Sequence, residues 1–364
     1  MSGNDSVRVV VDGRALVGNR TGIGVHTAEI CARLDSVETP LIASHKVIEN
    51  REALQRCRFD VRGTGPGVWW QQFYLPRLAA DEGCNVVWGP HGTLPIGMKT
   101  AGVVTVHDLT SITRPASHRL KTLASFNLFI GRSLGQAKRI AAVSRITADA
   151  LVRGFAIEPR KITVVPNGVD EFFSPAVSSG EEKLPAGLES GGYILFVGTI
   201  EPRKGIEHLL IAWEALPEPR PKLVLCGDRG WGRVRRLDRA LENKELVMLS
   251  FVNRGTLRAL YRHALLFVYP SLEEGFGIPP LEAMACGAPV IASRTGAVAE
   301  YLGGIGIVIE PGDLRALTEA LAALAGNRSL RGEMSGAGID RAREWRWERS
   351  ASLMTEIFRD AAGE

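Results

Sequence analysis

The chain has 364 residues, of which 45% are hydrophobic and 23% charged, with a formal net charge of +4. This length predicts about two domains, each with enough apolar residues for a buried core. No apolar run reaches the roughly 18 residues of a membrane span, and the N-terminus lacks the regions of a signal peptide. The five cysteines are scattered without a Cys-x-x-Cys pair, which indicates reduced thiols in the cytoplasm and neither disulfides nor zinc.

Apolar runs of strand length alternate with helical patterns along the first half. The first run, Val7–Val11, precedes a glycine-containing loop, 12–21, and a helix that ends near Leu34. Further runs follow in chain order: Leu41–Ala43, Asn85–Trp88, Val103–Val106, Ile140–Val143 and Ile162–Val165. Because most of these runs are apolar throughout, both of their faces should be covered, as in a parallel sheet.

A segment rich in serine, glycine, proline and charge, 176–191, lacks periodicity and is predicted to be a linker. A second series of strands follows it: Tyr193–Val197, Lys222–Cys226, Leu246–Leu249, Leu265–Tyr269, Pro289–Ala292 and Ile305–Ile309. After Gly312 the pattern is helical to the C-terminus. We therefore predict two doubly wound α/β domains, residues 1–175 and 192–340, with a helix in 341–364 that packs back on the first.

Positive charge is concentrated in the first half. Residues 114–161 carry ten Lys or Arg and only two acidic residues. Within this stretch Leu123, Phe126 and Ile130 recur at helical spacing beside basic residues. Two interpretations stay open: an interfacial helix on an anionic membrane, or an apolar stripe packed into the core with its cations solvated.

The most specific motif is SLEEGFGIPPLE, residues 271–282, directly after a predicted strand. Pro280 suits the first turn of a helix, so we expect Glu274 in the loop and Glu282 in the first turn. Backbone N–H groups of Gly275–Ile278 and the helix start favour an anion, and α/β folds bind ligands at this edge. Two carboxylates beside a phosphate site suit hydroxyl recognition, one for a ribose and one for a sugar.

A second motif, GTIEPRKG, carries Arg203 and Lys204 between a predicted strand and the helix Ile206–Leu216. Two adjacent cations at a helix N-terminus oppose the helix dipole, which favours anions there. A bound diphosphate would resolve this conflict through charge-assisted hydrogen bonds. The alternative is a pair of solvated cations.

Two weaker signals lie in the first half. Gly22 and Gly24 open the first helix, but Thr27 stands where a dinucleotide site needs a third glycine. We therefore expect a loop that a ligand approaches closely and no NAD site. His107 follows a predicted strand and is placed for a substrate hydroxyl, although a lone histidine is as often structural. No clustered His/Cys set indicates a metal.

Together these strings resemble the family 4 retaining glycosyltransferases. The matching strings span nearly the whole chain: TGIG at 21–24, VHD at 106–108, AVS at 142–144, PNGVD at 166–170, EPRKG at 201–205 and EEGFGIPPLEAMACGAPVIAS at 273–293. The resemblance implies the GT-B fold, in which two Rossmann-like domains face each other across a cleft that holds the active site. It also implies no metal requirement and no cofactor beyond a nucleotide-sugar donor.

The resemblance assigns the donor site residue by residue. Arg203 and Lys204 match the pair that neutralises the donor diphosphate. Glu274 matches the glutamate that faces the transferred sugar, and Glu282 the one that holds the ribose. With His107, which matches a sugar-proximal histidine, Arg203, Lys204 and Glu274 are the expected catalytic residues.

The remaining donor contacts implied by the resemblance are backbone or base contacts. The loop at the sugar and phosphates is formed by Gly275, Phe276, Gly277 and Ile278. The loop of the N-terminal domain contains Gly22 and Gly24, and the segment that reads the base contains Phe251, Val252 and Asn253.

The TGIG opening and the length look most like bacterial mannosyltransferases of surface-polysaccharide assembly. This implies GDP-mannose as donor and a glycan or lipid-linked saccharide as acceptor, bound by the first domain. A nucleotide-sugar 2-epimerase of the same fold and a non-catalytic nucleotide-sugar-binding subunit are the alternatives; the cation pair and both glutamates favour the transferase. We expect a cytoplasmic protein, attached peripherally to the inner face of the membrane if at all, with no nucleic-acid partner.

Overall fold

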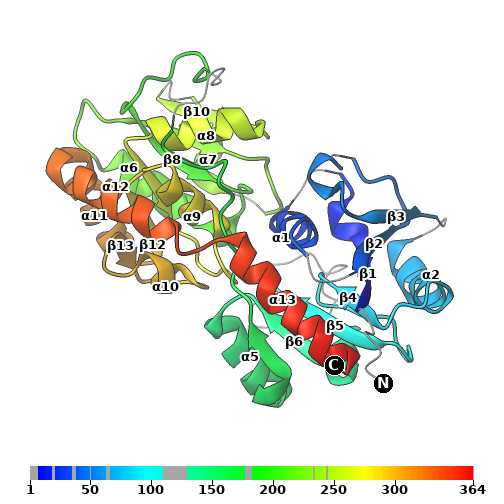
Figure 1. Ribbon diagram of the computed structural model, residues 1–364. Helices are drawn as coiled ribbons and strands as arrows, with labels where there is room; N and C mark the ends of the chain where they lie inside the picture. Colours follow the sequence, from blue (N-terminus) through cyan, green and yellow to red (C-terminus); the bar gives the residue numbers. More distant parts are fainter. Residues whose placement is uncertain are drawn as a thin grey trace. The chain divides into compact units, whose positions relative to one another are not determined.

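Figure 1 shows the computed structural model, which describes residues 7–18, 21–34, 38–49, 51–62, 66–109, 129–176, 183–232, 234–242 and 245–363. The chain divides into two compact units. Unit 1 comprises Met1–Gly168 and Trp347–Glu364, and unit 2 comprises Val169–Arg346. Each unit contains one parallel sheet with helices packed on it, which is the Rossmann-like α/β architecture.

Unit 1 is built on a seven-stranded sheet in the order β3-β2-β1-β4-β5-β6-β7. Its strands are β1 (Arg8–Asp12), β2 (Glu38–Ser44), β3 (Arg58–Val61), β4 (Val86–Gly89), β5 (Ala101–Val106), β6 (Arg139–Ala142) and β7 (Ile162–Val164). Neighbouring strands pair in parallel. The strand order reverses between β1 and β4, and this switch point is where open α/β sheets bind ligands.

The helices of unit 1 pack on this sheet. They are α1 (Gly22–Cys31), α2 (Gly67–Asp81), α5 (Arg145–Phe155) and α13 (Trp347–Ala362), with short 3-10 turns η1 (Gly13–Leu16), η2 (Glu52–Leu54) and η4 (Pro159–Lys161). Although α13 is the last helix of the chain, it packs against α1, β5 and β6, so the chain returns to unit 1 at its end (Figure 1).

Unit 2 is built on a six-stranded sheet in the order β10-β9-β8-β11-β12-β13. Its strands are β8 (Tyr193–Val197), β9 (Lys222–Cys226), β10 (Leu246–Leu249), β11 (Leu266–Tyr269), β12 (Val290–Ser293) and β13 (Ile307–Ile309). Its helical elements are η5 (Pro202–Lys204), α6 (Ile206–Glu214), α7 (Arg235–Ala240), α8 (Arg254–His263), α9 (Ile278–Ala285), α10 (Val298–Leu302), α11 (Leu314–Gly326) and α12 (Arg328–Ala342). The strand order of this sheet reverses between β8 and β11.

Two local features differ from the sequence expectations. The edge strand β3 was not predicted, because in Arg58–Val61 the apolar residues only alternate with charged ones. The division between units falls at Gly168, before the expected end of the first domain at 175. Val169 belongs to unit 2 because its N–H donates to the Trp345 carbonyl at 2.8 Å. Residues 177–182 of the expected linker lie outside the described residues.

The basic stretch of unit 1 is described only in part. Leu123 and Phe126 of its apolar stripe lie outside the described residues. Ile130 is 1% exposed and packs into the core of unit 1 with Leu134. Because Ile130 is covered by protein, it is not part of a membrane-facing stripe, and the core interpretation holds for this residue. Within the described ranges, no helix has the length and apolarity needed to cross a bilayer.

Candidate functional site

The switch point of the unit 2 sheet brings the two strongest motifs together. The chain leaves β8 at Val197 and reaches η5, and it leaves β11 at Tyr269 and enters the loop 270–277. The Leu272 N–H donates to the Arg203 carbonyl at 2.8 Å, which ties the loop to η5. Residues that are about 70 positions apart in sequence thus meet at the carboxyl edge of neighbouring strands, where this architecture binds ligands.

Glycine lets the two segments approach this closely. Gly205 ends η5 with a φ of 69°, and a Cβ on it would lie 2.1 Å from the Pro270 carbonyl oxygen. Gly277 caps the N-terminus of α9 with a φ of 90°, and its carbonyl accepts a hydrogen bond from the Tyr301 hydroxyl at 2.7 Å. A side chain at Gly205 would push the η5 cations away from the loop, so the packing of the two motifs depends on glycine here.

Lys204 and Glu274 form a buried ion pair in this switch point. The Lys204 ammonium donates to Glu274 Oε1 at 2.5 Å and to the Tyr269 hydroxyl at 2.9 Å. Burial alone would lower the pKa of Lys204, but the charge of Glu274 and the Tyr269 phenol raise it. Burial alone would raise the pKa of Glu274, but Lys204 and then Arg203 lower it. Both groups are therefore charged at neutral pH.

Arg203 is held beside this pair by backbone and carboxylate oxygens. Its guanidinium donates to Glu201 Oε1 at 2.8 Å and to the Glu273 carbonyl at 2.9 Å, and lies 3.5 Å from Glu274 Oε2. The electrostatic conflict expected from the sequence is therefore resolved within the protein by Glu201 and Glu274. From the sequence we considered a bound diphosphate or solvent as the counterpart of these cations and did not consider the two carboxylates; binding of a diphosphate here stays a prediction.

The second glutamate of the motif is placed differently from the prediction. Helix α9 begins at Ile278, so Glu282 is its fifth residue and lies in the second turn, not the first. The helix starts early because the left-handed Gly277 turns the chain directly into it and both following prolines fit the first turn. Glu282 is fixed by the Tyr261 hydroxyl of α8, which donates to its Oε2 at 2.9 Å.

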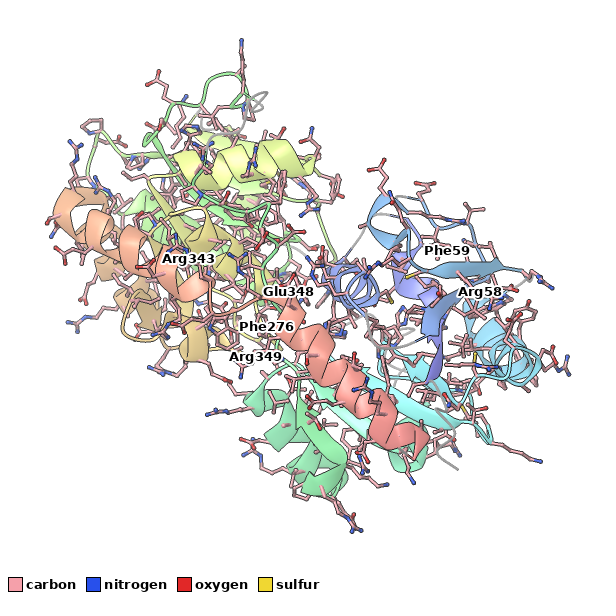
Figure 2. All side chains as sticks on the ribbon, in the orientation of Figure 1. Arg58, Phe59, Phe276, Arg343, Glu348 and Arg349 are labelled. Atoms are coloured by element: carbon pink, nitrogen blue, oxygen red, sulfur yellow. The ribbon has the colours of Figure 1, made fainter. Side chains whose placement is uncertain are left out.

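Phe276 and the segment 251–253 differ in exposure. The Phe276 ring is buried against Tyr301 and Trp345, so only its backbone is placed for a ligand (its label in Figure 2 marks the position). Phe251 is 62% exposed. Asn253 caps α8, because its Oδ1 accepts from the Thr256 N–H at 2.9 Å. Its side chain therefore has a structural partner already.

His107 lies after β5 in unit 1, in a buried aromatic cluster. Its Nε2 is 3.0 Å from the Pro90 carbonyl oxygen, which can only accept, so Nε2 carries the proton and Nδ1 the lone pair. The ring meets His26 edge to face, with centroids 4.8 Å apart. Burial, then the neighbouring His26, lowers the pKa of His107 well below its usual value, so the imidazole is neutral.

His26 is a site neighbour that the sequence analysis did not single out. Its Nδ1 is 2.8 Å from Asn167 Oδ1, and burial lowers its pKa to about 4. The residue lies on α1, in the helix opened by Gly22 and Gly24. A single histidine on an apolar helix gives no signal in the sequence, whereas Asn167 lies in a motif, PNGVD, that was quoted. Gly22 is exposed at the helix start and Gly24 is buried.

Comparison with known proteins identifies the family. The family model described as Glycosyltransferase Family 4 matches residues 20–171, and the one described as Glycosyl transferases group 1 matches residues 183–341. The O-antigen chain mannosyltransferase B of Escherichia coli is 33% identical over 281 residues, which are 74% of this chain and 73% of that protein. The chain is a family 4 glycosyltransferase.

Other relatives of this glycosyltransferase agree with that assignment. The O-antigen chain mannosyltransferase RfbU of Salmonella typhimurium is 28% identical over 280 residues, covering 76% of this chain and 73% of that protein. Sucrose-phosphate synthase from Thermosynechococcus elongatus superposes with a TM-score of 0.77 at 20% identity, over 98% of each chain. This likeness shows the GT-B fold.

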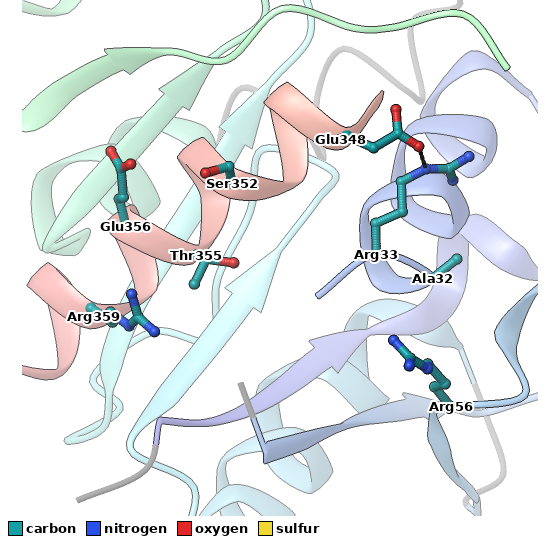
Figure 3. Close-up of a pocket in the computed structure, with 8 residues that line it drawn as sticks. All are labelled: Ala32, Arg33, Arg56, Glu348, Ser352, Thr355, Glu356 and Arg359. Atoms are coloured by element: carbon teal, nitrogen blue, oxygen red, sulfur yellow. Dashed lines mark hydrogen bonds and ion pairs between the residues drawn. The ribbon is translucent and has the colours of Figure 1, made fainter. Parts of the chain in front are cut away.

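Unit 1 of the glycosyltransferase also contains a pocket, which differs from the site formed by Arg203, Lys204 and Glu274 in unit 2. It has a volume of about 410 Å³ and is lined by Ala32 and Arg33 just after α1, by Arg56 before β3 and by residues of α13 (Figure 3). Arg33 is already paired with Glu348 at 2.7 Å and with Glu29. We assign no ligand to it. In the described parts of the chain, no three His, Cys, Asp or Glu side chains are grouped so as to hold a metal ion.

Proposed function

We propose that this glycosyltransferase transfers mannose from GDP-mannose, with retention of configuration, to a glycan or lipid-linked acceptor in bacterial surface-polysaccharide assembly. The observation that carries the proposal is the cluster of Arg203, Lys204 and Glu274 at the switch point of unit 2. The names of the two O-antigen mannosyltransferase relatives support the sugar and the class of product.

The cluster has the chemistry that departure of a nucleoside diphosphate needs. As the bond between the sugar and the diphosphate breaks, negative charge develops on the leaving oxygen. Arg203 and Lys204 are held in place by Glu201, Glu274 and Tyr269 before any ligand arrives, so they stabilise this charge without reorganising. Lys204 has three donors, and only two of them have partners among the described residues.

Glu274 is assigned to the transferred sugar and Glu282 to the ribose. Glu274 stays ionised because the cations lower its pKa, so its oxygens accept hydrogen bonds from sugar hydroxyls. Glu282, fixed by Tyr261, presents a carboxylate from the second turn of α9. In unit 1 the neutral His107 offers its Nδ1 lone pair to a sugar hydroxyl.

Retention requires departure and attack on the same face of the sugar. In this proposal the acceptor hydroxyl approaches beside the leaving diphosphate, whose oxygen takes the acceptor proton as the new glycosidic bond forms. The chain then needs no enzymic nucleophile. The nucleotide-sugar donor and the acceptor are the two reactants, and the two cations take the role that a metal ion fills in other phosphate sites, so we propose metal-independent transfer.

The basic stretch of unit 1 supports a proposal of peripheral contact with an anionic membrane. Since Ile130 is buried in the core, attachment rests on charge: each Lys or Arg near an anionic surface contributes about 1 kcal/mol, which fades within a Debye length. Attachment of this kind is weak and sensitive to salt.

Turnover across a donor panel tests the proposal. GDP-mannose, UDP-glucose and UDP-N-acetylglucosamine are each incubated with the enzyme, with and without a saccharide acceptor, and nucleotide release is followed. We expect release to be fastest with GDP-mannose and to require the acceptor. Preference for a UDP-sugar overturns the donor assignment. Rapid acceptor-independent release with epimerised sugar would identify a 2-epimerase, and binding without release a non-catalytic subunit.

A further inference from the structure

The carboxyl edge of the unit 1 sheet carries a row of polar side chains. His45 follows β2, Arg14 follows β1, His91 follows β4 and His107 follows β5. These four strands are neighbours in the order β2-β1-β4-β5, and the switch point lies between β1 and β4. The row therefore crosses the position at which this architecture places a ligand.

An ion pair between Asp12 and Arg14 lies at the centre of the row. Asp12 is fully buried, and Arg14 donates to both of its carboxylate oxygens, from Nε to Oδ1 at 2.9 Å and from a terminal nitrogen to Oδ2 at 2.7 Å. Gln71 of α2 donates to Asp12 Oδ2 at 2.8 Å and to the Thr93 carbonyl at 3.0 Å. The guanidinium is fixed in orientation, and its charge is already compensated.

Two neutral imidazoles flank this pair. Burial is the main cause that lowers the pKa of His91 and of His45. The charge of Asp12 opposes this shift and the charge of Arg14 adds to it, in both residues. Each Nδ1 is buried and has no hydrogen-bond partner among the described residues. A buried polar atom without a partner costs free energy, which a ligand hydroxyl that donates to it or accepts from it would offset.

His91 also links the Asp12–Arg14 pair and His45 to His107, the residue that we assign to the donor sugar. It lies close enough to His107 to lower the pKa of that residue, and His107 bonds to Pro90, the residue before His91. A transferred sugar near His107 must receive its acceptor hydroxyl from an adjacent position. His91 and the Asp12–Arg14 pair are the next polar groups along the sheet edge.

We propose that His91, His45 and the Asp12–Arg14 pair form an acceptor subsite that takes an uncharged sugar ring of the acceptor through its hydroxyls. The inference rests on the proposed function, because His107 marks the donor sugar. The charge of the site selects the class of ligand. Two neutral imidazoles, an amide and one guanidinium that is paired with Asp12 match hydroxyls. A phosphate is better matched by two adjacent cations, such as Arg203 and Lys204 in unit 2.

Ligand-observed NMR titration tests the subsite. The probes are methyl α-mannoside and mannose 6-phosphate, added to the full chain saturated with GDP. The variants are His91→Leu, which removes the hydrogen-bonding atoms, and His91→Gln, which restores a donor and an acceptor. His263→Leu in unit 2 is the matched control, since the His263 imidazole lies outside the proposed subsite and its Nδ1 is 3.0 Å from the Ser190 hydroxyl.

We expect the wild type to bind methyl α-mannoside more tightly than mannose 6-phosphate. Affinity for methyl α-mannoside should fall about fivefold in His91→Leu, recover in His91→Gln and stay unchanged in His263→Leu. Tighter binding of mannose 6-phosphate, no saccharide binding by a wild type that binds GDP, or an unchanged affinity in His91→Leu overturns the subsite. GDP affinity is titrated separately in every variant, and its absence in the wild type counts against the proposed function. Circular dichroism and thermal unfolding show whether unit 1, which contains His91, is folded in His91→Leu.

Discussion

Replacing Lys204 by methionine should destabilise unit 2, by an amount that depends on how deeply Glu274, the partner of Lys204, is buried. Lys204 is 8% exposed, and the Glu274 side chain 11%. Methionine fills a similar volume but removes the ammonium 2.5 Å from Glu274 Oε1, so a carboxylate is left buried without its main partner. Breaking a buried pair on one side costs about 3–5 kcal/mol.

The lower end of that range applies here, because Arg203 stays 3.5 Å from Glu274 Oε2 and compensates part of the charge. A loss of about 3 kcal/mol lowers the melting temperature of a unit of this size by about 6–12 °C. The double variant Lys204→Met with Glu274→Gln removes both charges and should recover most of the loss, to within about 1 kcal/mol of the wild type.

The loss should also depend on pH. The pKa of Glu274 is lowered in the folded protein, so its stabilisation is present above the unfolded pKa and is lost as pH falls through the folded value. The difference in free energy of unfolding between wild type and Lys204→Met should therefore be largest near pH 7 and should decrease below about pH 4.

Scanning calorimetry of the ligand-free protein measures these differences, with the exposed Lys46→Met as control for loss of one positive charge. A shift under about 2 °C for Lys204→Met would show that the pair does not hold the site together. A double variant as unstable as the single one would show that the loss arises from packing and has no electrostatic origin.

Three further predictions concern the reaction and its location. Turnover should persist in excess chelator, because Arg203 and Lys204 supply the charge at the diphosphate; loss of activity that Mg²⁺ or Mn²⁺ restores would refute this. The anomeric NMR signals of the product should show the donor's configuration, and an inverted linkage would exclude the same-face mechanism. The protein should sediment with anionic but not neutral vesicles at low salt, less so with Arg119→Glu and Lys121→Glu; no sedimentation of the wild type would leave only solvated cations.

Much of the fold could be predicted because most of its strands are apolar. Tyr193–Val197 and Lys222–Cys226 have the same bounds in sequence and structure, since both faces of a central parallel strand are apolar. The edge strand Leu246–Leu249 was also predicted with its exact bounds, because all four of its residues are apolar. The edge strand β3 escaped prediction because one side of an edge strand tolerates charge. Sequence patterns therefore find an apolar strand, even at the edge of a sheet, more readily than an edge strand that carries charge.

The residues of the candidate site could be predicted from the sequence, but the contacts between them could not. Spacing alone placed Arg203, Lys204 and Glu274 at carboxyl strand ends, and the structure brings them together. No pattern could show that Glu274 already compensates the cations, because that depends on the distance between two loops; Glu201, two residues before Arg203, was overlooked within the motif itself. His26 could not be found for a similar reason: its partners, His107 and Asn167, come from the segments after β5 and after β7.

Calorimetric titration of GDP into wild type and into the Arg203→Ala, Lys204→Ala double variant tests the central claim most directly. The claim is that the cation pair at the switch point of unit 2 binds the diphosphate of a nucleotide-sugar donor. Removing both cations should weaken GDP binding at least about tenfold, roughly 1.4 kcal/mol. Circular dichroism of each variant verifies that it is folded. An unchanged GDP affinity in a folded double variant would contradict the account.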